Sequence, residues 1–142
     1  MSTSQADGRW EGSLKDGKGV MKPANGSEVP FSLGTRFEGA KGSNPEEMIG
    51  AALAGCFSMA LSAELGKAGL TPTRIATHAA VKLDKVGDGF EVTQIALTCE
   101  ATVPGADAAK LEQIAQATKN ACPISKALGG VKEITLKATL TG

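Results

Sequence analysis

Residues 43–67 read SNPEEMIGAALAGCFSMALSAELGK, and this stretch decides the fold. Asn44 is a suitable N-cap for a helix, Pro45 suits the first helical position, and Glu47 stands where the acid of a capping box belongs. We therefore expect a helix that runs from this start to about Lys67, shortly before a glycine and a proline.

The interior of this helix, Met48 to Leu61, is apolar on nearly every side and is interrupted only by glycine, alanine and serine. A surface helix carries one apolar stripe, whereas a helix that is apolar all round is buried on all sides. A length of about 20 residues would also suit a membrane span. The many alanines and glycines, the acidic start and the missing basic flanks favour a buried helix instead.

Strand patterns flank this helix on both sides. The clearest is a hairpin over 74–103, in which apolar and polar residues alternate and a Gly-Asp-Gly turn at 87–89 reverses the chain. The other expected elements are strands at 9–14, 19–22, 29–37 and 133–140 and helical segments at 107–120 and 123–128.

These elements predict an α+β fold in a single domain, residues 1–142, with mainly antiparallel sheets and a very apolar central helix. About six short strands from one chain are too few to cover such a helix on all sides. Two copies of the helix that bury each other would solve this problem, so we expect a homodimer.

The charge balance argues against several classes of partner. The chain has 142 residues with 15 basic and 15 acidic side chains, so no long-range field favours nucleic acid or an anionic membrane. The N-terminus lacks the basic and apolar regions of a signal peptide. Three cysteines, an odd number, argue against a structural disulfide framework. We therefore expect a protein of the reducing cytoplasm.

Two of the three cysteines are candidates for chemistry. Cys56 lies deep in the apolar helix, where a lone cysteine is most often a small packed hydrophobe with a raised pKa, unreactive unless a cation lies within reach. Cys122 directly precedes Pro123 at the N-cap of a short helix, where the dipole favours a thiolate, although a mere boundary residue is an equal alternative. Cys99 falls on the apolar face of the hairpin, and packing explains it fully.

Few other residues offer chemistry on their own. Arg36, taken alone, fits a solvated charge at the end of a strand. His78 lies on a polar strand face and has no second histidine or neighbouring cysteine to complete a metal site. The glycine pairs are turns and not phosphate loops, because no Gly-x-x-x-x-Gly-Lys-Ser/Thr follows a strand.

Several motifs, taken in chain order, resemble the OsmC family, which is the osmotically inducible protein C branch of the OsmC/Ohr superfamily. The central ones are TRFEG at 35–39, GSNPEEMIGAA at 42–52, AGCFSMAL at 54–61 and ACPIS at 121–125. WEG at 10–12, LDKV at 83–86 and VPG at 103–105 also match, so the resemblance spans essentially the whole chain.

The resemblance implies a thiol-dependent hydroperoxide peroxidase of oxidative and osmotic stress defence. Cys56 matches the family's peroxidatic cysteine, Cys122 its resolving cysteine, Arg36 the arginine that activates the thiolate, and Glu46 the glutamate that orients this arginine. Glu47 could share the role of Glu46. The implied assembly is an intertwined homodimer with antiparallel sheets around long central helices. The implied reactants are a hydroperoxide and an external dithiol, with no metal or organic cofactor.

The chemistry of these residue types agrees with the implied roles. A guanidinium keeps its charge and can stabilise a buried thiolate, and a sulfenic acid at Cys56 would condense with a nearby thiol. Apolar surroundings favour organic hydroperoxides over small polar ones. Glu46 and Cys56 are ten residues apart on one helix, about 15 Å along its axis, and cannot meet in one site of one subunit. We therefore expect Arg36 and Glu46 to reach Cys56 of the partner subunit.

Two other functions are alternatives to the peroxidase. A non-enzymatic stress protein could bind apolar ligands between its sheets, and replacement of Cys56 by serine would then leave its activity intact. A thiol enzyme of another kind, such as a disulfide reductase or a thioester hydrolase, would need a Cys-x-x-Cys pair or a basic histidine near a cysteine. The sequence offers neither.

Overall fold

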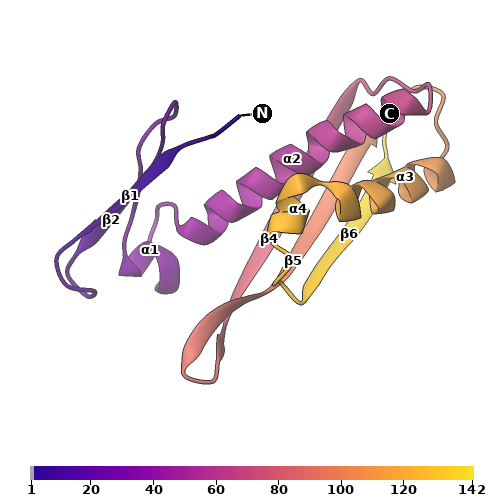
Figure 1. The fold of residues 1–142 in the computed structure, drawn as a ribbon. Helices are drawn as coiled ribbons and strands as arrows, with labels where there is room; N and C mark the ends of the chain where they lie inside the picture. The colour runs from indigo at the N-terminus through magenta and orange to yellow at the C-terminus, as the bar shows by residue number, and fades with distance from the viewer. Residues whose placement is uncertain (1) are drawn as a thin grey trace. The chain divides into compact units, whose positions relative to one another are not determined.

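The computed structural model describes residues 2–142, which divide into two compact units, residues 2–48 and 49–142. Each unit contains a three-stranded sheet and at least part of a helix (Figure 1). The chain is therefore α+β with two sheets and helices, as the sequence predicts.

The first unit is an antiparallel meander followed by a short helix. Its elements are β1 (Ala6–Glu11), β2 (Lys18–Pro23), β3 (Val29–Phe31) and α1 (Leu33–Phe37), with β2 in the middle of the sheet. The rings of Trp10 and Phe31, with centroids 5.6 Å apart, pack over Gly19. A Cβ at Gly19 would lie 2.5 Å from the Phe31 ring, so only glycine leaves room for this pair.

The strand predicted over 29–37 is wrong in its second half, because Leu33–Phe37 forms α1. Ser32 caps this helix: its hydroxyl accepts a hydrogen bond from the Thr35 N–H at 3.2 Å, and the Thr35 hydroxyl accepts one from the Ser32 N–H at 2.9 Å. This reciprocal capping box ends the strand at Phe31.

The second unit holds most of a long helix and a sheet of two long strands and one shorter one. Its elements are α2 (Pro45–Lys67, which begins in the first unit), β4 (Arg74–Val86), β5 (Gly89–Thr102), α3 (Ala108–Ala121), α4 (Pro123–Ala127) and β6 (Glu133–Leu140). The antiparallel hairpin of β4 and β5 is confirmed, and its turn contains Gly87 at φ +60°, a conformation that glycine adopts without strain.

The third strand of this sheet departs from the expected antiparallel pattern. β6 pairs with β5 in parallel, so that Ile95 lies opposite Ile134 and Cys99 opposite Ala138. A parallel pair needs a crossover connection between its strands. α3 and α4 supply that connection, and the chain therefore enters β6 in the same direction as β5.

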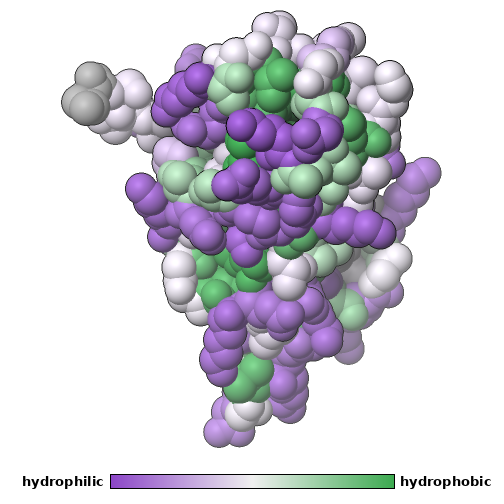
Figure 2. All heavy atoms as spheres, turned by 90° about the vertical axis from the view of Figure 1, so that its right-hand side faces the viewer, coloured by the Kyte–Doolittle hydropathy of each residue, from purple (hydrophilic) through white to green (hydrophobic). Residues whose placement is uncertain are grey.

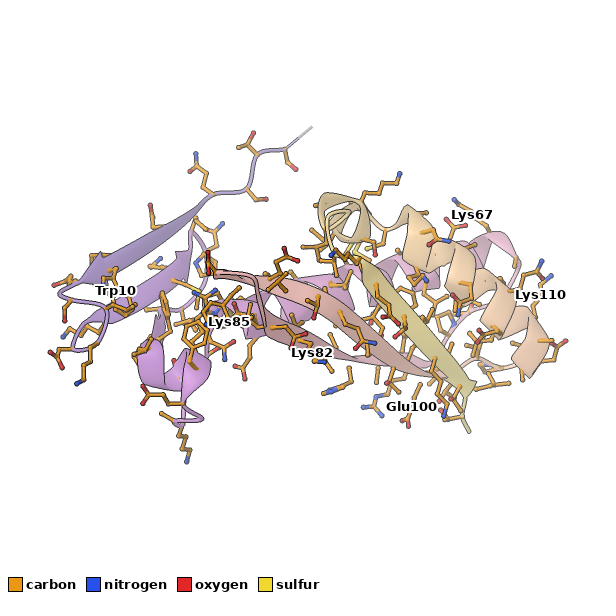
Figure 3. The ribbon with its side chains drawn as sticks, turned by 90° about the horizontal axis from the view of Figure 1, so that it is seen from below. Trp10, Lys67, Lys82, Lys85, Glu100 and Lys110 are labelled. Carbon is orange, nitrogen blue, oxygen red and sulfur yellow. The ribbon has the colours of Figure 1, made fainter. Side chains whose placement is uncertain are left out.

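The core of the second unit lies between its sheet and its helices. Ile95, Leu97, Cys99 and Ala101 alternate along β5 and are buried, which confirms the predicted apolar face. α2 and α3 cover this face of the sheet (Figure 1). Lys82 and Glu100 project from the opposite face of the sheet and are exposed (Figure 3).

One side of α2 is fully buried in this core. The side chains on it recur every fourth residue and are 0% exposed: Leu53, Phe57, Leu61 and Leu65. Gly50 lets the helix approach β4 closely, because a Cβ at this position would lie 3.1 Å from the Val81 methyl.

The opposite side of α2 is uncovered within a single chain. Met59 on it is 80% exposed, and Ala52, Gly55 and Ala63 are exposed as well. The face of the molecule drawn in Figure 2 also carries hydrophobic side chains between hydrophilic ones. One chain therefore buries a single side of a helix whose sequence is apolar all round. The predicted burial of the other side would require a second molecule.

α2 is also the one helix among residues 2–142 that is long and apolar enough to cross a membrane. Length and composition alone support this, and core helices of soluble proteins have the same properties. One side of it, the leucine and phenylalanine stripe, packs into the core with β5.

Replacement of Leu61 by alanine should lower the free energy of unfolding by about 2–5 kcal/mol, because it removes a fully buried side chain and leaves a cavity. Urea unfolding at one fixed protein concentration measures this change. Ser62→Ala, which alters the exposed neighbouring position, should stay within about 0.5 kcal/mol of the unmodified protein. Equal effects of the two changes would contradict the assignment of the core.

Replacement of Cys99 by valine should make stability less dependent on pH under alkaline conditions. Burial raises the pKa of the Cys99 thiol, although the Thr77 hydroxyl partly opposes the shift. In the unfolded chain a cysteine loses its proton near pH 8.5, roughly, so its stabilising contribution is complete below this pH and is lost as the pH rises through the folded pKa. Unfolding of both proteins at about pH 8 and about pH 10 should show the steeper loss for the unmodified chain. Equal slopes would refute this.

Candidate active site

The sulfur atoms of Cys56 and Cys122 lie side by side in the second unit. Cys56 comes from the middle of α2, and Cys122 stands at the junction of α3 and α4. The Cys122 thiol donates to Cys56 Sγ across 2.7 Å, and both cysteines are free. A disulfide bond is about 2.05 Å long, so a small approach of the two sulfurs would join them.

Backbone hydrogen bonds hold Cys122 on both sides. Its N–H donates to the Thr118 carbonyl at 2.9 Å, which closes α3, and its carbonyl accepts from the Lys126 N–H at 3.1 Å, which opens α4. The predicted N-cap position is confirmed. The side chain does not cap the helix, however; it is 1% exposed and its thiol is directed at Cys56.

The surroundings of Cys56 disfavour its thiolate. Burial raises the pKa of the Cys56 thiol above its ordinary value, and the neighbouring Cys122 side chain raises it further. The backbone N–H of Ile124, in the first turn of α4, lowers this pKa in part. None of the groups in residues 2–142 that shift the pKa is a cation. A nearby positive charge would lower the pKa of this half-buried thiol and make Cys56 a stronger nucleophile.

Arg36 and Glu46 form a second pair, in the first unit. Arg36 lies in the last turn of α1 and Glu46 in the first turn of α2. The Arg36 Nε donates to both carboxylate oxygens of Glu46, at 3.0 and 3.2 Å, and its Nη2 donates to Oε1 at 2.6 Å. The carboxylate thus fixes one edge of the planar guanidinium. The ring of Phe37 lies 5.3 Å from the guanidinium carbon.

The loop between α1 and α2 is held in place by Asn44. Its side-chain oxygen accepts the Glu47 N–H at 2.9 Å and caps α2, and its side-chain nitrogen donates to the Thr35 carbonyl in α1 at 3.2 Å. Gly42, at φ +141°, passes so close to Thr35 that a Cβ would lie 2.9 Å from its methyl group. These contacts hold the α1 segment that carries Arg36 against the start of α2.

Glu47 makes contacts that differ from those of Glu46. Its carboxylate accepts a hydrogen bond from the Ser43 hydroxyl at 2.8 Å, and its side chain is exposed. Glu46, by contrast, is 8% exposed and holds the arginine. The two neighbouring glutamates therefore serve different purposes: Glu47 binds the Ser43 hydroxyl before the helix, and Glu46 forms the ion pair with Arg36.

The structure brings the four candidate residues together as two pairs, Arg36 with Glu46 and Cys56 with Cys122, in different units. Cys99 packs in the core. No group of three or more His, Cys, Asp or Glu side chains suited to a metal occurs within residues 2–142. The contribution of Ile124 was not expected from the sequence, because it comes from a backbone N–H that only the packing of α4 directs at Cys56.

Comparisons with known proteins place the chain in a family. The family model of OsmC-like proteins matches residues 38–137. Peroxiredoxin OsmC of Escherichia coli is 54% identical over 129 residues, 89% of each chain. The organic hydroperoxide resistance protein of Xanthomonas axonopodis pv. citri is 30% identical over 99 residues, 69% of this chain and 68% of that protein. An OsmC-like protein from Mycoplasma pneumoniae shares the fold, with a TM-score of 0.78 at 15% identity over 99% of both chains. By its sequence and by its fold, this chain belongs to the OsmC family.

Proposed function

We propose that this chain is a cysteine-based hydroperoxide reductase that acts in stress defence. The contact of the Cys56 and Cys122 sulfurs at 2.7 Å carries this proposal, since it sets one thiol where it can react with an oxidised form of the other. The E. coli relative is named a peroxiredoxin, and the Xanthomonas relative is named for resistance to organic hydroperoxides.

The reaction proceeds in three balanced steps. The Cys56 thiolate attacks one oxygen of the hydroperoxide and the O–O bond breaks, so that Cys56 becomes a sulfenic acid. The departing alkoxide takes up the proton that the thiol released and leaves as an alcohol. The Cys122 thiol then displaces the sulfenic oxygen as water, and a disulfide forms. An external dithiol reduces this disulfide by thiol exchange and is itself oxidised.

Arg36 supplies the positive charge that Cys56 requires. Glu46 fixes the direction in which its guanidinium points. The pKa of Cys56 is raised, and no cation within residues 2–142 lowers it. Ten residues of α2 separate Glu46 from Cys56, about 15 Å of helix. We therefore assign Arg36 of the partner subunit to each Cys56.

A homodimer accounts for surfaces that one chain leaves uncovered. The outer side of α2 carries Met59, which is 80% exposed, in a stripe of small residues that allows a second helix to approach closely. Within a single chain, residues 2–48 bury no large hydrophobic side chain. Both surfaces would be covered if residues 1–142 form one domain that intertwines with a second copy around paired α2 helices.

The substrate side of the site favours organic hydroperoxides. A groove of about 400 Å³ in the first unit is lined by Arg36 and by aromatic and aliphatic side chains, among them Trp10, Phe31, Phe37 and Leu14. An apolar groove beside the activating arginine suits the organic part of a peroxide. We place the protein in the cytoplasm, where dithiol reductants are available.

One equivalent of cumene hydroperoxide should be consumed by the reduced protein with the loss of two hydrogens from its intact mass. Peptide mapping should place the new bond between Cys56 and Cys122, because their sulfurs are in contact. Cys56→Ser should consume no peroxide, and Cys122→Ser should stop at the sulfenic acid.

Cys99→Ser is the matched control, since it removes the third cysteine and should leave the bridge intact. An unchanged mass with the peroxide left in solution would reject the peroxidase. If Cys56→Ser then retained the affinity of the protein for apolar ligands, the binding protein without enzymatic activity would be the better explanation.

Two inactive variants should restore activity to each other when they are unfolded and refolded together. Arg36→Gln retains Cys56, and Cys56→Ser retains Arg36, so a mixed dimer contains one site with both residues intact if the site spans two subunits. A 1:1 mixture should then recover about a quarter of the unmodified activity, because about half of the dimers are mixed and each has one complete site.

The measurement is peroxide consumption by the refolded mixture against each variant refolded alone. Arg9→Gln is the control for loss of an arginine, since Arg9 pairs with Glu11 on an exposed strand. A mixture that stays as inactive as its components, although size and mass show mixed dimers, would place Arg36 and Cys56 in the same subunit.

A further inference from the structure

The hydroxyl of Ser125 is a buried group without a hydrogen-bond partner. It is the one buried side-chain polar atom in residues 2–142 of which this is true. A buried donor or acceptor that is left unpaired destabilises the fold, and such groups call for a functional or structural reason.

The helix geometry explains why the usual partner is missing. Ser125 is the third residue of α4, after the N-cap Cys122, and a polar side chain at this position commonly reaches back to the N–H of the N-cap residue. Here the Cys122 N–H already donates to the Thr118 carbonyl, because the same residue ends α3. The Ser125 hydroxyl is therefore excluded from the capping box.

The first turn of α4 packs against the two sulfur atoms. Cys122 directs its sulfur at Cys56, and the Ile124 N–H acts on the Cys56 sulfur. Ser125 is the third residue of α4, and a side chain at this position reaches back toward the N-cap residue, here Cys122. Its buried hydroxyl therefore lies on the side of α4 that carries Cys122.

We propose that the Ser125 hydroxyl donates a hydrogen bond to the oxygen of the Cys56 sulfenic acid and assists its departure as water. This inference rests on the proposed function. In the dithiol form the two sulfurs present no oxygen acceptor, whereas the peroxide delivers one oxygen to Cys56. The unpaired hydroxyl gains a partner only at that stage of the reaction.

The step that it assists is the condensation of the sulfenic acid with Cys122. The Cys122 sulfur attacks Cys56 Sγ, the S–O bond breaks, and the oxygen leaves with its own hydrogen and the proton of the Cys122 thiol as water. A hydrogen bond from Ser125 stabilises the negative charge that develops on the leaving oxygen. Ser125 keeps its own proton throughout. Faster condensation also leaves less time for a second peroxide to oxidise the sulfenic acid to sulfinic acid.

Ser125→Ala tests this directly. Reduced protein is mixed with one equivalent of cumene hydroperoxide, quenched at increasing times, and analysed by intact mass for the species with one added oxygen and the species that has lost two hydrogens. In Ser125→Ala the first species should persist about tenfold longer than in the unmodified protein, the size expected for one lost hydrogen bond to a charged group. An excess of peroxide should also convert more of it to sulfinic acid.

Two further variants separate chemistry from structure. Ser125→Thr keeps a hydroxyl and should restore rapid condensation. Ser58→Ala removes a hydroxyl that is already paired, to the Ala54 carbonyl at 2.8 Å and to the Thr77 hydroxyl at 2.7 Å. It should lower stability and leave the lifetime of the sulfenic acid unchanged, whereas Ser125→Ala should keep the unfolding midpoint in urea or raise it.

If the sulfenic acid of Ser125→Ala condensed at the rate of the unmodified protein, the inference would be wrong. It would also be wrong if Ser125→Ala failed to fold or lost as much stability as Ser58→Ala. Either result would mean that the Ser125 hydroxyl already has a hydrogen-bond partner in the dithiol form. These results leave the peroxidase itself intact. If the unmodified protein formed neither oxidised species, the proposed function and this inference would both be wrong.

Discussion

The stripe of Leu53, Phe57, Leu61 and Leu65 packs one side of α2 into the core that β5 and α3 complete. Because the stripe sets the rotation of the helix, it also decides where every other side chain of α2 points. Cys56, the residue before Phe57, reaches the junction of α3 and α4, where its sulfur meets that of Cys122. Met59 and its small neighbours are left on the opposite side, uncovered.

Two pairs of residues then divide the proposed chemistry. Cys56 and Cys122 can form a disulfide. None of the groups in residues 2–142 that shift the pKa of Cys56, however, is positively charged. Arg36 and Glu46 supply a charge with a fixed direction but contain no nucleophile. Neither pair is sufficient for catalysis alone, and a helix as long as α2 keeps Glu46 and Cys56 of one subunit about 15 Å apart. We therefore propose that a second subunit brings the Arg36–Glu46 pair to the Cys56–Cys122 pair.

Sequence reasoning succeeded where the signal is local. The start of α2 is predicted correctly from Asn44, Pro45 and Glu47. The alternation of apolar residues along β5 correctly predicts that Cys99 lies in the core. It failed at α1, because a capping box within a single turn outweighs strand periodicity. It found the strand β6 but not its direction, because parallel pairing depends on how α3 and α4 return the chain. Position alone favoured packing for Cys56, and only the family resemblance singled it out. The Ile124 N–H and the unpaired Ser125 hydroxyl are properties of packing that no sequence pattern contains.

The raised pKa of Cys56 has a consequence for a reductase built in this way. A thiol protonated at neutral pH reacts slowly with peroxide, so a chain without its partner would be protected from uncontrolled oxidation. In the proposed dimer, a guanidinium from the second subunit would lower that pKa, and the thiolate would form beside a second thiol that is already in contact with it. Activation of Cys56 and closure of the disulfide would then be coupled, because the proposed site becomes reactive only when the two subunits assemble around the Cys56–Cys122 pair.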